Sequence, residues 1–121
     1  MIDSPTVKRL ALALPEAQDT STEGRVVICV RGKAFAWTYL ERLKRRGRRR
    51  PNAGVLAVRC TEERKEMLIA AAPDRFFDDG HDRGFAAVLV RLDATDEDEL
   101  ANRLHDAWRL VAPSRLAKRF A

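Results

Sequence analysis

Two strand-like segments separated by a tight turn constrain the fold of this chain more than any other feature of its sequence. Residues 26–30 (VVICV) are apolar throughout, which predicts a strand covered on both faces. Residues 33–40 (KAFAWTYL) predict a second strand with one face packed against a helix. Its alternation places three aromatic residues on one side: Phe35, Trp37 and Tyr39. Arg31-Gly32-Lys33 indicates a tight turn, because glycine adopts a positive φ at little cost.

Three helices are predicted from capping residues and from apolar side chains that recur every three or four positions. The first opens at Ser4-Pro5 and stops at Pro15. The second opens at Thr61 and ends at Pro73. Its expected buried face consists of Met67, Leu68 and Ala71. The third opens at a capping-box pattern, Thr95-x-x-Asp98, and keeps the 3.6-residue period for three turns.

The remaining apolar segments complete a sheet. Residues 55–60 and 85–92 are predicted to be strands, whereas 16–23 and 74–83 are predicted to be irregular connections. The resulting order is helix, three strands, helix, strand, helix. Hairpin-like connections favour an antiparallel sheet backed by helices, which is an α+β fold. The length of 121 residues and the lack of an internal repeat predict a single domain over residues 1–121.

Positive charge is concentrated in one segment. The chain has 23 Lys and Arg residues and 18 Asp and Glu residues, a net charge of +5. Seven basic residues and no acidic residue lie between positions 42 and 50: Arg42, Lys44, Arg45, Arg46, Arg48, Arg49 and Arg50. Without them, 16 basic residues would face 18 acidic ones. Gly47, Pro51 and Gly54 surround them, so we expect a basic flexible loop at 41–54.

Metal binding and catalysis find little support in the sequence. A polar turn is the favoured interpretation of four neighbouring polar residues: Asp78, Asp79, His81 and Asp82. The positive end of a helix dipole accounts for a second acidic group: Asp93, Asp96, Glu97, Asp98 and Glu99. Cys29 and Cys60 lie in apolar stretches and are interpreted as core residues, not as a disulfide framework. We therefore expect no enzyme, cofactor or metal centre.

The sequence also shows neither a membrane-spanning stretch nor the pattern of a signal peptide. No apolar run reaches the ~18 residues that a membrane span requires. The first residues (MIDSP) lack the basic start and the apolar core of a secretory signal. We expect a cytoplasmic protein without membrane contact.

Five segments, taken in order along the chain, are similar to those of one family of small bacterial proteins. They are LALPE (12–16), VRGKAFA (30–36), LIAAAPDRFF (68–77), AVLVRLD (87–93) and AWRLVAPSRL (107–116). On these segments, which cover nearly the whole chain, the protein resembles the MmcQ/YjbR family. The resemblance implies a frataxin-like (CyaY-like) α+β fold and DNA binding through a pair of wing-like hairpins. It implies no defined reaction.

The resemblance also singles out Lys33 and His81, which match motif positions of the family. If the sheet brings these two side chains together, they would bind a small anion. Family members often carry an aromatic residue after the histidine, but Asp82 stands there in this chain. No stacking role is therefore carried over to that position.

The favoured functional hypothesis is non-specific binding of nucleic acid, DNA or another polyanion, through residues 42–50. Guanidinium groups bind phosphate oxygens in pairs and stay charged at physiological pH. A short basic tail after Pro113 would help. Phosphate contacts position a protein without reading bases, so no sequence preference is expected. Two alternatives stay open: an adaptor whose basic loop grips an acidic protein partner, and a small-anion binder at Lys33 and His81.

Overall fold

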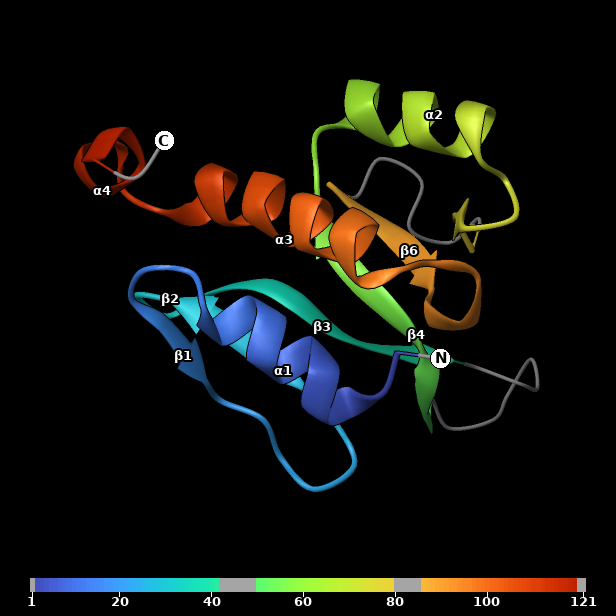
Figure 1. Ribbon diagram of the computed structural model, residues 1–121, viewed down its shortest axis with the longest axis horizontal. Helices are drawn as coiled ribbons and strands as arrows, with labels where there is room; N and C mark the ends of the chain where they lie inside the picture. The colour runs from blue at the N-terminus through green and yellow to red at the C-terminus, as the bar shows by residue number, and fades with distance from the viewer. Residues whose placement is uncertain (1, 42–49, 80–85, 120–121) are drawn as a thin grey trace.

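The computed structural model describes residues 2–41, 50–79 and 86–119. Within them, six strands form one antiparallel sheet in the order β1-β2-β3-β4-β6-β5 (Figure 1). The strands are β1 (Ala17–Asp19), β2 (Val27–Val30), β3 (Lys33–Glu41), β4 (Arg50–Arg59), β5 (Phe76–Phe77) and β6 (Ala87–Arg91). The helices are α1 (Ser4–Leu12), α2 (Glu62–Ala71), α3 (Glu97–Val111) and α4 (Ser114–Arg119), with a 3₁₀ turn at η1 (Leu92–Ala94). The α+β class and the antiparallel sheet are confirmed.

The β2–β3 hairpin turns through two residues in the left-handed region of φ. Arg31 has a φ of 50° and Gly32 a φ of 83°, and Val30 pairs with Lys33 across the turn. Positive φ at both central residues is the pattern of a type I′ hairpin turn, so the predicted tight turn is confirmed. The Arg31 guanidinium donates hydrogen bonds of 3.0 and 3.3 Å to the Glu16 carboxylate. This contact holds the pKa of the Glu16 carboxyl below its ordinary value.

A bulge in β3 overturns the predicted grouping of its aromatic residues. Ile28 pairs with Ala36 and Cys29 pairs with Ala34, so Phe35 is an extra residue in the strand. Because the bulge interrupts the two-residue alternation, Phe35 and Ala36 are both buried in the core. Trp37 is half-buried and lies outside the core cluster. The expectation that the three aromatics share one face is therefore wrong.

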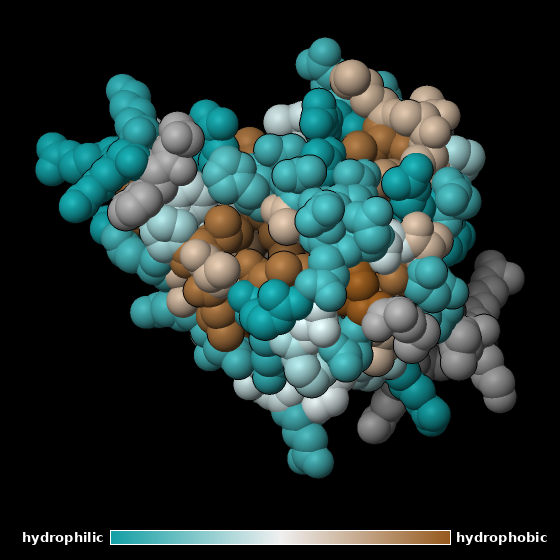
Figure 2. Space-filling view, in the orientation of Figure 1, coloured by the Kyte–Doolittle hydropathy of each residue, from teal (hydrophilic) through white to brown (hydrophobic). Residues whose placement is uncertain are grey.

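The core lies between the sheet and helices α1 and α3 (Figure 1). Four side chains of α3 are fully buried against the sheet: Leu100, Leu104, Ala107 and Trp108. The Trp108 indole N–H donates a 2.9 Å hydrogen bond to the Pro15 carbonyl, which ties α3 to the end of the first helical segment. Hydrophobic side chains are visible along the seam between α1 and α3 (Figure 2). Leu10 of α1 and Val111 of α3 pack against the core. The predicted long final helix is confirmed.

Several element boundaries differ from the sequence prediction. Asp3, not Ser4, caps α1 by accepting a 3.0 Å bond from the Thr6 N–H. Asp96, not Thr95, caps α3 by accepting a 2.8 Å bond from the Glu99 N–H. The Thr95 hydroxyl instead donates to the Arg91 carbonyl. In each case a carboxylate adjacent to the predicted hydroxyl reaches the free N–H groups of the first turn.

Two short strands occupy stretches that were predicted to be irregular, 16–23 and 74–83. They are β1 and β5, which form the two edges of the sheet. An edge strand needs only one partner, so backbone hydrogen bonds to β2 or β6 form without a distinctive run of apolar side chains. The basic tail after Pro113 also forms a short helix, α4.

The loop predicted at 41–54 is wrong at both of its ends. Glu41 is the last residue of β3, and residues 50–54 belong to β4. Pro51 is tolerated because, among the described strands, this part of β4 pairs with β3 alone, so the missing N–H costs no bond to a second described strand. Residues 42–49 lie outside the described residues.

Candidate functional site

The basic segment begins and ends on a two-stranded ribbon. Glu41 pairs with Arg50, Leu40 with Pro51 and Tyr39 with Asn52. Among the described strands, β2 is last paired with β3 at Trp37, and β6 pairs with β4 only from Val55 onward. β3 and β4 therefore continue as a pair beyond the rest of the sheet (Figure 1). We call residues 39–41 and 50–52 the ribbon.

Side-chain hydrogen bonds hold the ribbon in place. The Asn52 amide donates a 3.1 Å bond to the Glu41 carboxylate across the two strands. The Asn52 side-chain oxygen accepts a 3.0 Å bond from the Gly54 N–H. The Tyr39 hydroxyl donates a 2.9 Å bond to the Asp79 carboxylate, which connects the ribbon to the segment that follows β5. The two ends of the basic segment are thus positioned by the fold.

Arg50 is the one predicted nucleic-acid-binding residue that lies within the described part of the chain. It is exposed at the first position of β4 and makes no ion pair with a described carboxylate. The other six candidates lie outside the described ranges: Arg42, Lys44, Arg45, Arg46, Arg48 and Arg49. Their number and order along the chain come from the sequence alone.

Many basic residues elsewhere are paired with carboxylates. Described pairs include Lys8 with Asp19 at 3.4 Å, Arg31 with Glu16 at 3.0 Å and Lys65 with Asp78 at 3.2 Å. Arg9 also pairs with Glu97. By net count, the excess positive charge of the chain belongs to residues 42–50, because 16 basic residues face 18 acidic ones elsewhere.

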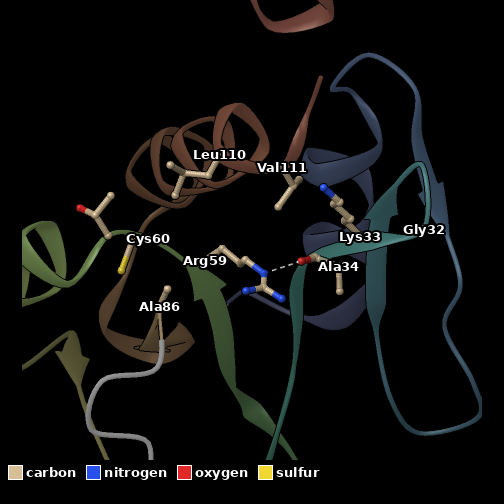
Figure 3. A pocket seen from close by; sticks show the side chains of 9 residues that line it. Gly32, Lys33, Ala34, Arg59, Cys60, Ala86, Leu110 and Val111 are labelled. Atoms are coloured by element: carbon tan, nitrogen blue, oxygen red, sulfur yellow. Dashed lines mark hydrogen bonds between the residues drawn. The ribbon is translucent and has the colours of Figure 1, made fainter. Parts of the chain in front are cut away.

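Lys33 lies at the opposite end of β3 from the ribbon and lines a cavity together with Arg59 (Figure 3). Its predicted partner, His81, lies outside the described residues, so the pairing of Lys33 with His81 stays a prediction. Arg59 was missed in the sequence, where it ends an apolar strand (VLAVR). The position of Arg59, a charged residue at the end of an apolar strand, was the one sequence feature that could have marked it as a candidate.

Several described members of the two acidic groups singled out in the sequence form ion pairs, hydrogen bonds or helix caps. Asp78 pairs with Lys65, and Asp79 accepts the bond from Tyr39. Asp96 caps α3, and acidic residues fill the first turn of that helix, as predicted. Within the described ranges, no group of three or more His, Cys, Asp or Glu side chains is placed to hold a metal ion.

Both cysteines are buried and free, in agreement with their interpretation as core residues. Burial raises the pKa of the Cys60 thiol to about 11. A thiol with such a pKa stays protonated at neutral pH and is a weak nucleophile. No helix in the described ranges has the length and apolar character needed to span a membrane.

Comparison with known proteins identifies the family. The sequence profile of the YjbR family matches residues 12–110. This chain belongs to the YjbR family. The match to the family covers β1 through nearly all of α3, together with the basic segment, Lys33 and His81. The resemblance inferred from the sequence is confirmed.

Relatives of this chain occur in mycobacteria. It is 36% identical over 81 residues to Rv2570 of Mycobacterium tuberculosis and to Mb2600 of Mycobacterium bovis, both named as uncharacterized proteins. The match covers 66% of this chain and 63% of the length of each relative. The crystal structure of Deinococcus radiodurans protein DR2400, a DUF419 domain, is similar in fold. The TM-score is 0.67 at 19% identity, over 98% of this chain and 91% of that chain.

Proposed function

We propose that this YjbR-family protein binds nucleic acid through residues 42–50, without sequence specificity. The observation that carries the proposal is a run of seven basic residues within nine positions, six between the paired ends of the ribbon and the seventh, Arg50, on the ribbon itself. Arginine guanidinium groups bind phosphate oxygens in a bidentate way. The proposal includes no catalytic step.

The ribbon supports this function by its shape. A two-stranded antiparallel ribbon is one of the two elements that the major groove of B-DNA admits. The ribbon extends beyond the strands on either side of β3 and β4, so a duplex would meet it before the rest of the sheet. Arg50 is exposed at the far end of the ribbon, where it pairs with Glu41, and is accessible to a phosphate there.

Charge distribution supports the same interface. Outside residues 42–50, 16 basic residues face 18 acidic ones, so the remainder of the chain does not attract a polyanion by net charge. Binding that depends on displaced counterions should therefore depend on this one segment. We expect about four or five phosphate contacts, because seven basic side chains on one short segment cannot all reach the same backbone at once.

The test is fluorescence anisotropy of a labelled DNA duplex at several salt concentrations. The intact protein should bind with a slope of log K against log salt of about −3 to −5. A variant with Arg45, Arg46, Arg48, Arg49 and Arg50 changed to Ser should bind far more weakly and with a flatter slope. A duplex of scrambled sequence should bind equally well.

Matched variants separate charge from other effects. The same five arginines changed to Lys keep the charge and should bind with nearly the same salt slope. A variant with Arg115 and Lys118 changed to Ser measures the smaller contribution of α4. Absence of binding at low salt, or equal binding by the intact and Ser variants, would contradict the proposal. In that case the basic segment should be tested against acidic proteins.

A further inference from the structure

A cavity of about 580 Å³ lies at the end of β3 opposite to the ribbon (Figure 3). Four separate parts of the chain line it: the β2–β3 turn, the end of β4, the start of β6 and the end of α3. The lining residues are Gly32, Lys33, Ala34, Arg59, Cys60, Thr61, Ala86, Leu110 and Val111. Its volume is within the range of about 300–1,000 Å³ that small-molecule sites occupy.

Two cationic side chains face this cavity. Figure 3 shows Lys33 extending from the hairpin towards Val111, and Arg59 lying across towards Ala34. The Arg59 Nε donates a 2.8 Å hydrogen bond to the Ala34 carbonyl, and its guanidinium lies 5.5 Å from the centre of the Trp37 ring. These contacts fix the orientation of Arg59. Among the described residues that line the cavity, two are basic and none is acidic, which favours binding of an anion.

The opposite wall of the cavity is apolar. Leu110 and Val111 form it at the end of α3, and Ala86 continues it at the start of β6. Leu110 is 51% exposed, which makes it one of the most exposed large hydrophobic side chains of the described residues. A ligand that covers Leu110 would remove apolar surface from water at no cost in buried polar groups.

We propose that this cavity binds a small organic carboxylate that carries an apolar body. The carboxylate lies near Lys33 and Arg59, and the apolar body lies on Leu110 and Val111. This activity is separate from nucleic-acid binding. Lys33 and Glu41 stand at opposite ends of β3, about 25 Å apart at the usual rise of a strand.

Heteronuclear NMR of the full chain, titrated with octanoate, tests the proposal. Backbone amide shifts should cluster at residues 32–34, 59–61, 86 and 110–111. Acetate has the headgroup without the apolar body, and octylamine has the body with the opposite charge, so both should produce much smaller shifts. No clustered shift at about 5 mM octanoate, a level that detects a Kd of about 1 mM, would overturn the proposal. Equal shifts with octylamine would also overturn it.

Matched pairs of variants locate the two halves of the site. Lys33→Gln should weaken octanoate binding about tenfold, the range expected when a charged hydrogen bond is lost. Lys118→Gln, an exposed lysine on α4 outside the cavity, should leave binding unchanged. Leu110→Gln should weaken binding several-fold, whereas Met67→Gln, exposed on α2, should not. If Leu110→Gln fails to fold, Lys33→Gln decides: unchanged affinity in that variant overturns the proposal.

Discussion

Helices α3 and α2 attach to the same sheet by different means. α3 buries four apolar side chains that are all 0% exposed: Leu100, Leu104, Ala107 and Trp108. α2 has one fully buried residue, Lys65, which is 3% exposed. Its apolar residues Leu68 and Ile69 are only half-buried. α3 is thus held by fully buried apolar side chains, whereas α2 combines partial apolar packing with a buried ion pair.

The attachments of α2 reach two other elements. The Lys65 ammonium lies 3.2 Å from the Asp78 carboxylate, just after β5. Arg64 lies 3.7 Å from Asp106 of α3, and Arg103 lies 3.4 Å from the same carboxylate. The Arg64 pair is half-exposed and contributes little, whereas the Lys65 pair is mostly withdrawn from water. The position of α2 therefore depends most on Lys65.

The largest expected effect is in α3. Leu104→Ala should lower the free energy of unfolding by about 3 kcal/mol, because it leaves a cavity in a fully buried site. Leu68→Ala in α2 should cost about 1 kcal/mol, since its side chain is only partly removed from water. Urea denaturation of both variants measures the difference. Equal losses would contradict the distinction between the two helices.

Lys65 gives the next largest effect and separates charge from packing. Lys65→Ala should destabilise the protein by about 2 kcal/mol, because it removes one charge of a largely buried ion pair and the packing of the lysine stem. Lys65→Met keeps most of the volume of the side chain, and we expect it to recover about 1 kcal/mol of that loss. The measurement is again urea denaturation, with Lys118→Ala as an exposed control. Should the Met and Ala variants be equally unstable, packing of the lysine stem contributes nothing.

The same contrast explains why the buried face of α3 was predicted correctly and that of α2 was not. The apolar period of α3 is carried by the residues that are buried, so the pattern and the packing agree. In α2 the predicted buried face was wrong at Met67, which is 56% exposed, and at exposed Ala71, whereas Leu68 packs partly against the core and Lys65 is buried. A lysine is buried only when a carboxylate meets it, and Asp78 is brought to Lys65 by the fold. The periodicity of apolar residues along α2 cannot predict a contact with a residue outside the helix.

In the sheet and the candidate site, too, local features could be predicted from the sequence, whereas features that depend on pairing between strands could not. The β2–β3 turn was predictable because the φ values of two adjacent residues decide it. The bulge at Phe35 depends on pairing between strands, so alternation alone placed Trp37 on the wrong face. The charge of residues 42–50 is visible in the sequence, but the ribbon that carries them depends on β3–β4 register. Arg59 and Lys33 line the same cavity only because the sheet places the end of β4 beside the start of β3.

The burial of Cys60, which lies just before α2, can be tested through the pH dependence of stability. Burial raises the pKa of its thiol from 9.0 to about 11. The folded state then holds a proton that the unfolded state has lost, so this contribution is complete below pH 9 and disappears as the pH rises to 11. Between pH 8 and pH 10 the intact protein should lose about 1 kcal/mol more than Cys60→Ala. Urea midpoints across this pH range measure it, and parallel curves for the two proteins would contradict a buried thiol.

Met67 should show the smallest effect and is the sharpest check on how α2 is attached. Its side chain is 56% exposed, although its position in the helix predicted a place in the core. Met67→Gln removes apolar surface that already faces water and keeps the helix propensity nearly unchanged, so stability should change by less than about 0.5 kcal/mol. Urea denaturation beside Lys65→Met compares two positions of the same helix. A loss above about 1 kcal/mol at Met67 would mean that Met67 belongs to the packed face of α2, and the ionic attachment through Lys65 would then be secondary.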